Sequence, residues 1–281
     1  FGRCKASNVP QDKILALREL CRSRSYLIDT AADLKRKLIA LLDRIFPEYE
    51  SLFDPVFGKA SIAVLRKYPT PQKIKNAHLG KLTELLMESS GGHFGEWKAR
   101  QLKEAAQNSF GIDDSCGVYS TLLGMFLEQI LSLTDQADSL EKQIASLLKE
   151  FDSQLTSIPG IGTVLAAMIL SEIGNISRFS SSDKLLAYAG LDPSVKQSGE
   201  FSSNQNRMSK RGSPYLRRAI WLASTVAVQC DPMFQAYYEK KTSEGLHYMN
   251  VIGHVSRKMT AVIFAVLRDG QPYQPILQSA G

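Results

Sequence analysis

Apolar residues recur at alternating spacings of three and four along two long stretches of this chain. The first stretch runs through Leu17, Leu20, Arg24, Leu27, Ala31, Leu34, Leu38, Leu41 and Ile45, with Arg24 as its polar exception. The second runs through Leu123, Phe126, Ile130, Leu133, Ala137, Leu140, Ile144, Leu147 and Phe151. This spacing predicts two long helices with a coiled-coil seam, which pair antiparallel within one chain or between chains. Two core helices of a bundle are an equally good interpretation.

Shorter helical pieces fill the region between the two stretches, about residues 47–117. Prolines and glycines separate them, namely Pro55, Gly58, Pro69, Pro71 and the pair Gly91-Gly92. We expect a small helical subdomain here. Its clearest element is an amphipathic helix from about Glu96 to Asn108. That helix and the turn before it fit either a degenerate helix-hairpin-helix or a capped surface helix.

A turn of sequence Pro159-Gly160-Ile161-Gly162 marks the start of the C-terminal half. The helix expected after it buries Val164, Leu165, Met168, Ile169 and Ile173. Such a turn is typical of a helix-hairpin-helix, in which Gly160 and Gly162 let the backbone approach a phosphate and the following helix start donates its amides. The same turn also occurs purely as a packing device, so both interpretations are open.

Capping residues delimit the helices that follow. Ser181 or Ser182 begins a short helix that stops at Gly190, and Ser213-Pro214 begins another that runs to about Gln229. Asp231-Pro232 starts a helix that ends near Gly245, and a last helix covers about residues 247–268, after which we expect a poorly ordered tail. The predicted fold is mainly α, with a helical and coiled-coil region over 1–150 and a helical domain over 151–281.

Composition narrows the class of protein. The chain has 281 residues, 44% of them hydrophobic, and a net charge of +6, which favours polyanionic partners. Its cysteines (Cys4, Cys21, Cys116 and Cys230) lack the spacing of a zinc site or a disulfide framework, so we expect a reducing compartment. No apolar run reaches membrane-spanning length, so no membrane partner is expected. Because the chain starts with Phe1 rather than Met, we expect a fragment of a longer protein.

A polar, basic segment interrupts the apolar helices between Tyr188 and Ala219. Its basic residues are Lys196, Arg207, Lys210, Arg211, Arg217 and Arg218, set against the single acid Glu200. Neighbouring Gly199, Ser209 and other small polar residues supply groups that bind phosphate oxygens. The segment therefore predicts a nucleic-acid-binding loop, although a solvated basic loop explains the same composition.

Residue chemistry alone does not identify a nucleophile in this segment. A serine hydroxyl needs a base or a cation to activate it, and the histidine nearest to Ser198, His247, is far away in sequence. We expect all four histidines (His78, His93, His247 and His254) to be ordinary surface or core residues. Asp231 and Glu239 are expected to be a helix cap and a solvated side chain, and Cys230 a small buried apolar residue. A metal-dependent nuclease is therefore a weak third hypothesis.

An ordered series of motifs over about residues 151–275 closely resembles a known family. The motifs are SIPGIG, FSSSDKLLAYAGLDP, QSG, NRMSKRGSPYLRRA and RKMTAVIFAVLRDGQPY. They resemble the C-terminal domain of the insertion-sequence transposases that pair an N-terminal RuvC-like DEDD domain with a serine-bearing domain. This family is the bridge-RNA-guided recombinases, and the heptad region resembles its coiled-coil linker.

The resemblance implies a specific chemistry. The serine of the SG pair maps onto Ser198 as the nucleophile that forms a covalent phosphoserine link to DNA. The acids that hold Mg²⁺ belong to the RuvC-like domain upstream of Phe1, so this chain is expected to hold no metal, to carry half of a composite site and to be inactive alone. Implied partners are the DNA of element ends and target, a structured guide RNA, and further copies of the chain in a dimer or tetramer.

The resemblance also implies a prokaryotic, cytoplasmic and nucleoid-associated protein. The main alternative, from a different class, is a non-catalytic helix-hairpin-helix module that binds nucleic-acid backbones and oligomerises through its heptads. Such a module would tolerate replacement of Ser198, whereas the enzyme would keep binding DNA and lose strand transfer.

Overall fold

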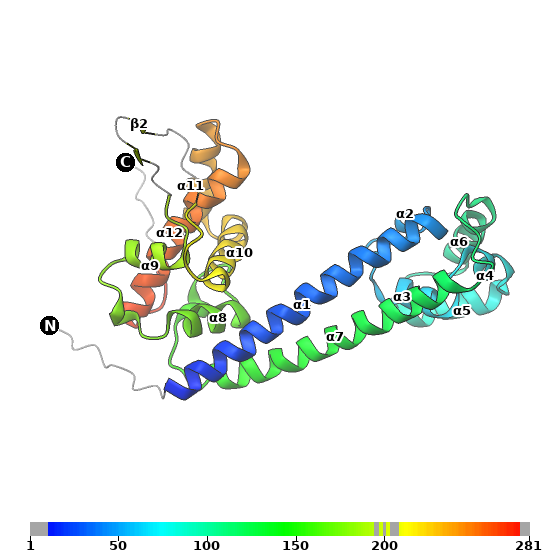
Figure 1. The fold of residues 1–281 in the computed structure, drawn as a ribbon, viewed down its shortest axis with the longest axis horizontal. Helices are drawn as coiled ribbons and strands as arrows, with labels where there is room; N and C mark the ends of the chain where they lie inside the picture. Colours follow the sequence, from blue (N-terminus) through cyan, green and yellow to red (C-terminus); the bar gives the residue numbers. More distant parts are fainter. Residues whose placement is uncertain (1–10, 194–196, 199–200, 203–207, 276–281) are drawn as a thin grey trace. The chain divides into compact units, whose positions relative to one another are not determined.

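The chain is mainly α-helical, as the sequence predicts. Its structure is a computed structural model that describes residues 11–193, 197–198, 201–202 and 208–275 (Figure 1). It divides into two compact units. Unit 1 comprises Phe1–Arg24 and Ser139–Gly281, and unit 2 comprises Ser25–Asp138. Unit 2 is therefore one continuous segment, whereas unit 1 is assembled from two segments of the chain.

The two long helices form as predicted, and each contributes to both units. They are α1 (Gln11–Ile45) and α7 (Val118–Leu148). In unit 1 they pair antiparallel within the chain, because Lys13 forms an ion pair with Glu150 and Arg24 forms one with Glu141 (Nη2–Oε2, 2.6 Å). The polar exception in the first apolar stretch is thus matched by a carboxylate on the opposing helix.

The buried faces of α1 and α7 agree with the predicted seam at every second layer. Leu17, Ala31, Leu38 and Ile45 are buried on α1, and Leu123, Ile130, Ala137 and Ile144 are buried on α7. Several of the layers between them lie one residue later than predicted. Cys21, Leu127 and Leu148 are buried, whereas Leu20, Phe126 and Leu147 are only partly so. Leu41 is buried as predicted, and Leu42 beside it is buried as well, so the apolar stripe is wider than one seam. Whether the two helices supercoil stays a prediction.

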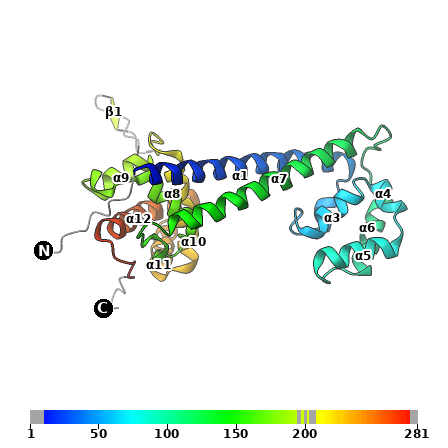
Figure 2. The same cartoon turned by 90° about the horizontal axis from the view of Figure 1, so that it is seen from below.

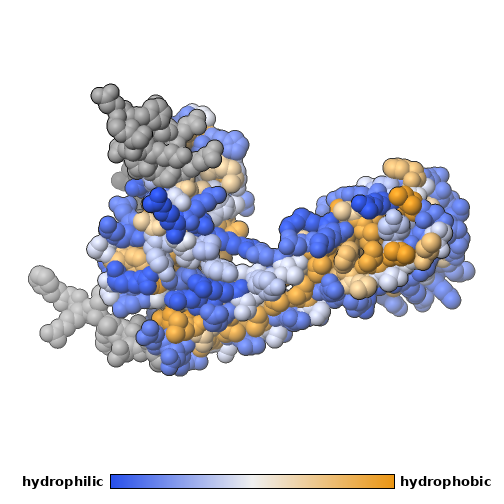
Figure 3. Space-filling model, in the orientation of Figure 1, coloured by the Kyte–Doolittle hydropathy of each residue, from blue (hydrophilic) through white to orange (hydrophobic). Residues whose placement is uncertain are grey.

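Unit 2 packs five short helices against its parts of α1 and α7. They are α2 (Tyr49–Leu52), α3 (Lys59–Lys67), α4 (Pro71–Asn76), α5 (Leu79–Ser90) and α6 (Glu96–Asn108). The bounds of α6 match the predicted amphipathic helix. Their core includes Phe46, Tyr49 and Leu82. Apolar side chains also reach the surface over this unit, among them Trp97, Phe110 and Met125 (Figure 3).

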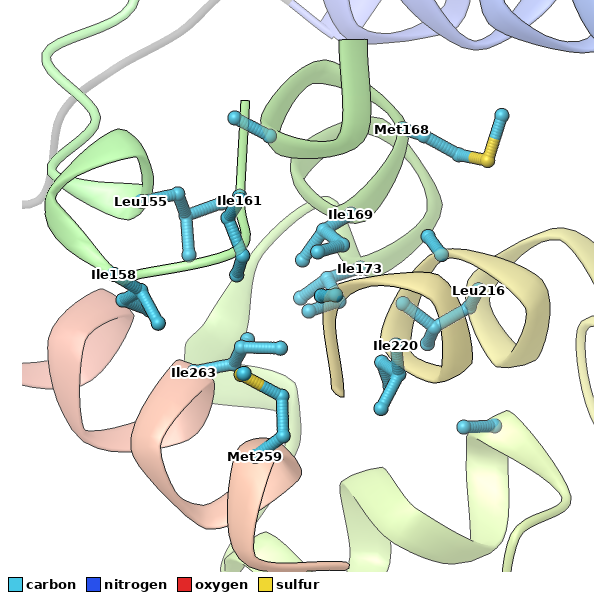
Figure 4. Packing of buried hydrophobic residues seen from close by; sticks show 14 of the residues in the cluster. Leu155, Ile158, Ile161, Met168, Ile169, Ile173, Leu216, Ile220, Met259 and Ile263 are labelled. Atoms are coloured by element: carbon cyan, nitrogen blue, oxygen red, sulfur yellow. The ribbon is translucent and has the colours of Figure 1, made fainter. Parts of the chain in front are cut away.

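Unit 1 is built from five helices and two 3₁₀ turns besides the ends of α1 and α7. The helices are α8 (Thr163–Ile173), α9 (Ser182–Ala189), α10 (Pro214–Cys230), α11 (Pro232–Ser243) and α12 (Tyr248–Asp269). The 3₁₀ turns are η1 (Leu155–Ser157) and η2 (Ile176–Arg178). Helix α10 packs against α8, α11 and α12. Figure 4 shows Ile169 of α8, Ile220 of α10 and Ile263 of α12 meeting in this core.

Three capping predictions are confirmed in unit 1. The side chains of Ser181, Ser213 and Asp231 accept hydrogen bonds from backbone amides at the starts of α9, α10 and α11. Each bond satisfies an amide that has no partner inside its helix. These caps fix where the chain enters and leaves the polar segment between α9 and α10.

One expectation for the C-terminal part is wrong, and a second does not hold for residues 271–275, while residues 276–281 lie outside the described part of the chain. Cys230 is exposed, because it is the last residue of α10, where the chain turns into the Asp231 cap. The tail is held in place as far as the structure describes it. The Tyr273 amide donates to Ser157 Oγ (2.8 Å), and its hydroxyl donates to Asp231 Oδ2 (3.1 Å). Burial and the neighbouring Asp231 carboxylate raise the pKa of Tyr273 to about 12.

The turn before α8 places its two glycines in different surroundings. Gly160 has φ +88°, and a Cβ there would lie 2.4 Å from the Ala223 carbonyl oxygen and 2.8 Å from the Ala227 amide nitrogen of α10. Gly162 is exposed, and a Cβ there would meet nothing within 4 Å. The close contact between the turn and α10 supports a packing role for Gly160, while Gly162 remains accessible at the start of α8.

Replacing Gly160 with alanine should therefore destabilise the protein. We expect Gly160→Ala to lower the free energy of unfolding by about 2 kcal/mol, because it adds strain at positive φ and a clash with α10. The matched control Gly162→Ala should cost less than about 1 kcal/mol, the scale of a changed N-cap. Chemical denaturation of both variants measures the difference. Equal stabilities would show that the approach to α10 does not require a glycine.

Candidate functional site

The polar segment leaves the helices at α9 and returns at α10. Gly190 ends α9 with φ +67°, a conformation that favours glycine, and its amide donates to the Ala187 carbonyl. On the returning side, Ser213 Oγ accepts from the Leu216 amide (3.2 Å) and Pro214 opens α10. Both ends of the segment are thus held by helix caps.

Between these caps the chain forms a β-hairpin that the sequence did not predict. Strands β1 (Gln197–Ser198) and β2 (Phe201–Ser202) pair antiparallel, with Ser198 opposite the first residue of β2. Closer to the helices, Pro193 forms an antiparallel bridge with Met208. Both ribbon views place the two strands outside the helical core of unit 1 (Figures 1 and 2). The candidate nucleophile therefore lies in a projecting hairpin.

Backbone hydrogen bonds close the foot of this hairpin, which we call the hairpin base and define as residues 188–192 and 208–213. Amides donate to carbonyls from Ser213 to Tyr188 (2.9 Å), from Lys210 to Gly190 (3.1 Å) and from Ser209 to Asp192 (2.8 Å). The Ser209 hydroxyl also donates to Asp192 Oδ1. All three backbone bonds run from the returning side to the departing side, so they hold the two sides of the base together.

Two glycines allow the two sides of the hairpin base to approach closely. A Cβ at Gly212 would lie 1.8 Å from the Tyr188 carbonyl oxygen, and one at Gly190 would lie 2.8 Å from the Gly212 amide nitrogen. Any other residue at either position would push the two sides apart. The short distance between the two sides of the hairpin base therefore requires glycine at both positions.

Lys210 adopts an uncommon backbone conformation in this base. Its φ is +54°, and it is the one non-glycine residue with positive φ among the described residues. Such a conformation is strained for most side chains and persists only where surrounding contacts impose it. Here the bond from its amide to Gly190 imposes it. The exposed side chains of Lys210 and Arg211 are consequently attached to a backbone that the hydrogen bonds of the base hold in place.

The structure brings several predicted nucleic-acid-binding residues together at this base. Lys210, Arg211 and Arg218 are exposed, and Arg217 is half-buried and donates from Nη1 to the Ala189 carbonyl (3.2 Å). Arg217 thus also links α10 to α9. The Ser209 hydroxyl donates a hydrogen bond to Asp192 Oδ1. The predicted Lys196, Gly199 and Arg207 lie outside the described residues.

The turn that contains Gly160 and Gly162 packs against α10, the helix that begins at the hairpin base. Gly160 contacts this helix at Ala223 and Ala227, one to three helical turns beyond Arg218 by the rise of an α-helix. The turn and the basic residues therefore lie along one helix. Of the two glycines, only Gly162 is exposed.

A buried carboxylate that the sequence did not single out lies beneath the hairpin base. Glu172, on α8, has a side chain only 1% exposed. It accepts hydrogen bonds from Arg22 Nε (2.7 Å) and Nη2 (3.1 Å) and from Ser213 Oγ (2.9 Å). Its backbone carbonyl accepts from the Tyr188 hydroxyl (3.3 Å). A single residue of α8 thus contacts both sides of the hairpin base and α1.

Helix α1 supplies the cation for this carboxylate. The hydrogen bond to Glu172 raises the pKa of the Arg22 guanidinium above its ordinary value, and Arg22 also lies 4.9 Å from the centre of the Tyr215 ring. One turn earlier, Arg18 donates from Nε and Nη2 to the Ser171 carbonyl (2.9 and 2.7 Å). A signal for this network was present in the sequence, because Glu172 is the only charged residue of α8.

The histidines and two acids that the sequence analysis considered lie in the surroundings predicted for them. All four histidines are exposed, Asp231 is a buried helix cap, and Glu239 is exposed on α11, as expected. Among the described residues, no group of three or more His, Cys, Asp or Glu side chains is placed to hold a metal ion. Within the same described part of the chain, no helix is long and apolar enough to cross a membrane.

The chain is similar to proteins of several insertion elements. It is 26% identical over 252 residues to the "Insertion element IS110 uncharacterized 43.6 kDa protein" of Streptomyces coelicolor, covering 88% of this chain and 62% of that protein. It is 28% identical over 280 residues to the corresponding IS116 44.8 kDa protein of Streptomyces clavuligerus, covering 96% and 69%. It is also 31% identical over 153 residues to the pilin gene-inverting protein of Moraxella bovis, covering 52% and 48%.

A family model matches the region that carries the hairpin. The chain spans about six-tenths of the length of the Streptomyces coelicolor relative. The model of the Transposase IS116/IS110/IS902 family matches residues 152–239, which include α8, α9, the hairpin and α10. The part of the chain that carries the hairpin is therefore similar to the transposases of this family.

Proposed function

We propose that this chain is part of an insertion-element DNA transposase or recombinase whose nucleophile is Ser198. The observation that carries the proposal is the position of Ser198 in a projecting hairpin, above a hydrogen-bonded base that presents exposed basic side chains. This arrangement lies inside the region that matches the transposase family. The motif resemblance supplies the assignment of the nucleophile.

The proposed step exchanges one phosphodiester for another. Ser198 Oγ attacks a DNA phosphorus, the bond from phosphorus to one deoxyribose oxygen breaks, and that oxygen takes up a proton as the serine loses one. The product is a phosphoserine diester. Attack by a second DNA hydroxyl then reverses the exchange and releases the serine, so the strands rejoin without net hydrolysis.

The basic residues at the hairpin base would bind the DNA backbone around this phosphate. Lys210 and Arg211 are exposed beside the base, and Arg218 is exposed on the first turns of α10. Their charges can offset the negative charge that builds up on the phosphate oxygens during the exchange. Gly162, accessible at the start of α8, is a further candidate contact with the backbone.

The other parts of the proposal come from the resemblance alone. Mg²⁺ would be held by acids of a separate RuvC-like domain, which would complete a composite site, so this chain would be inactive alone. A structured guide RNA would choose the target by base pairing, and the protein would act as a dimer or tetramer. The competing hypothesis, a binding module without catalysis, predicts no covalent adduct.

Replacement of Ser198 should abolish covalent adduct formation. The full-length protein, supplied with Mg²⁺, guide RNA and labelled junction DNA, should form a denaturant-resistant protein–DNA adduct whose linked peptide contains Ser198. Ser198→Ala should reduce the adduct by about 10³-fold or more. DNA affinity should be retained.

Ser202→Ala, on the opposing strand β2, is the matched control and should form the adduct normally. Recombination by the Ser198→Ala protein, or recombination by the wild type without any adduct, would overturn the assignment and favour the binding module.

Removal of exposed basic residues at the hairpin base should reduce the salt dependence of DNA binding. Each phosphate contact contributes about 0.9 to the slope of log K against log salt concentration on duplex DNA. Lys210→Ala and Arg211→Ala should each reduce the magnitude of this slope by about that amount. Lys142→Ala, an equal change of charge at an exposed site on α7, should leave it unchanged. Equal slopes in all three variants would place the DNA contacts elsewhere.

A further inference from the structure

The buried carboxylate of Glu172 has the contacts of a residue that positions the hairpin. Its side chain is 1% exposed, and its oxygens accept from two elements, Arg22 of α1 and Ser213 at the start of α10. Burial of a carboxylate is unfavourable unless such donors surround it. Both donors are therefore held in place relative to α8.

Ser213 connects this carboxylate to the returning side of the hairpin. Its hydroxyl donates to Glu172 Oε2 (2.9 Å) and accepts from the Leu216 amide (3.2 Å), so one oxygen joins α8 to the first turn of α10. Its amide donates to the Tyr188 carbonyl (2.9 Å). The last residue of the hairpin base thus has its side chain and its backbone fixed by separate partners.

Tyr188 connects Glu172 to the departing side. Its hydroxyl donates to the Glu172 carbonyl (3.3 Å), while its own carbonyl accepts from Ser213 and lies against Gly212. Its ring lies 5.3 Å from that of Phe179, and the guanidinium of Arg178 lies 4.5 Å from its centre. Both sides of the hairpin base are therefore hydrogen-bonded to Glu172 of α8.

We infer that Glu172 and Ser213 are positioning residues for the hairpin that carries Ser198, with Arg22 of α1 as the cation that orients the Glu172 carboxylate. The inference rests on the proposed function for its effect on strand transfer, but the positioning can be measured without it. Loss of either residue retains the basic side chains but loosens the base from which the hairpin projects.

The test uses the full-length protein with Ser213→Ala and Glu172→Gln. A glutamine at 172 offers one acceptor oxygen in place of two, so it cannot serve both Arg22 and Ser213 as the carboxylate does. At saturating DNA, the rate of adduct formation should fall about tenfold to a hundredfold in both variants, the scale expected for a misplacement of about 1 Å. DNA affinity should stay within about twofold, because the phosphate contacts remain.

Two further variants separate positioning from the loss of a helix cap. Ser181→Ala removes the N-cap of α9, whose hydroxyl accepts from the Lys184 amide and, among the described residues, does not bond to Glu172, so it should leave the rate unchanged. Ser213→Thr keeps a hydroxyl at the cap and should restore the rate to within about threefold. If Ser181→Ala slows the adduct as much as Ser213→Ala does, or if Glu172→Gln reacts at the wild-type rate, the inference is wrong.

Hydrogen exchange provides a readout that does not depend on chemistry. The amides of Ser209, Lys210 and Ser213, which close the hairpin base, should exchange about tenfold faster in Ser213→Ala and Glu172→Gln than in the wild type or Ser181→Ala. If the wild type forms no adduct yet recombines, the nucleophile assignment fails while this result still supports positioning. Unchanged exchange in both variants overturns the inference whatever the adduct shows.

Discussion

The carboxylate of Glu172 lies in a helix that is otherwise apolar, and a charge buried there is unfavourable unless donors approach it from several sides. The donors come from parts of the chain that are far apart in sequence, Arg22 on α1 and Ser213 on α10. Because removing one partner would leave an uncompensated charge, the three helices are tied to one arrangement. The hairpin base is built directly on this arrangement and takes its position from it.

The basic residues around the hairpin divide into two kinds. Arg217 donates a hydrogen bond to the Ala189 carbonyl, and Arg22 donates to the Glu172 carboxylate. Lys210 and Arg211 are exposed and stand on a backbone held by the bond to Gly190. Basic composition alone does not separate these kinds, since both contribute equally to net charge. Their surroundings give the first kind a structural role and leave the second kind exposed, as the proposed contact with the DNA backbone requires.

Local signals in the sequence were sufficient for the helices and their caps, since Ser181, Ser213 and Asp231 act within one turn of their own positions. They were not sufficient where a contact joins distant segments. The layer at Cys21 was misplaced because the apolar stripe of α1 is wider than one seam, so that Cys21 is buried and Leu20 beside it only partly so. The hairpin was missed because its register depends on close backbone contacts with α9. Glu172 was overlooked because its partner lies on α1.

Unit 2 is one uninterrupted segment, and the chain enters it along α1 and leaves it along α7. Such a segment can change in length without new connections to unit 1, because both of its ends continue helices that unit 1 already contains. Adding or removing seven residues in each helix would preserve which faces are buried. Evolution can therefore vary the size and surface of unit 2, or replace it, while the hairpin and the buried carboxylate beneath it keep the same neighbours in unit 1.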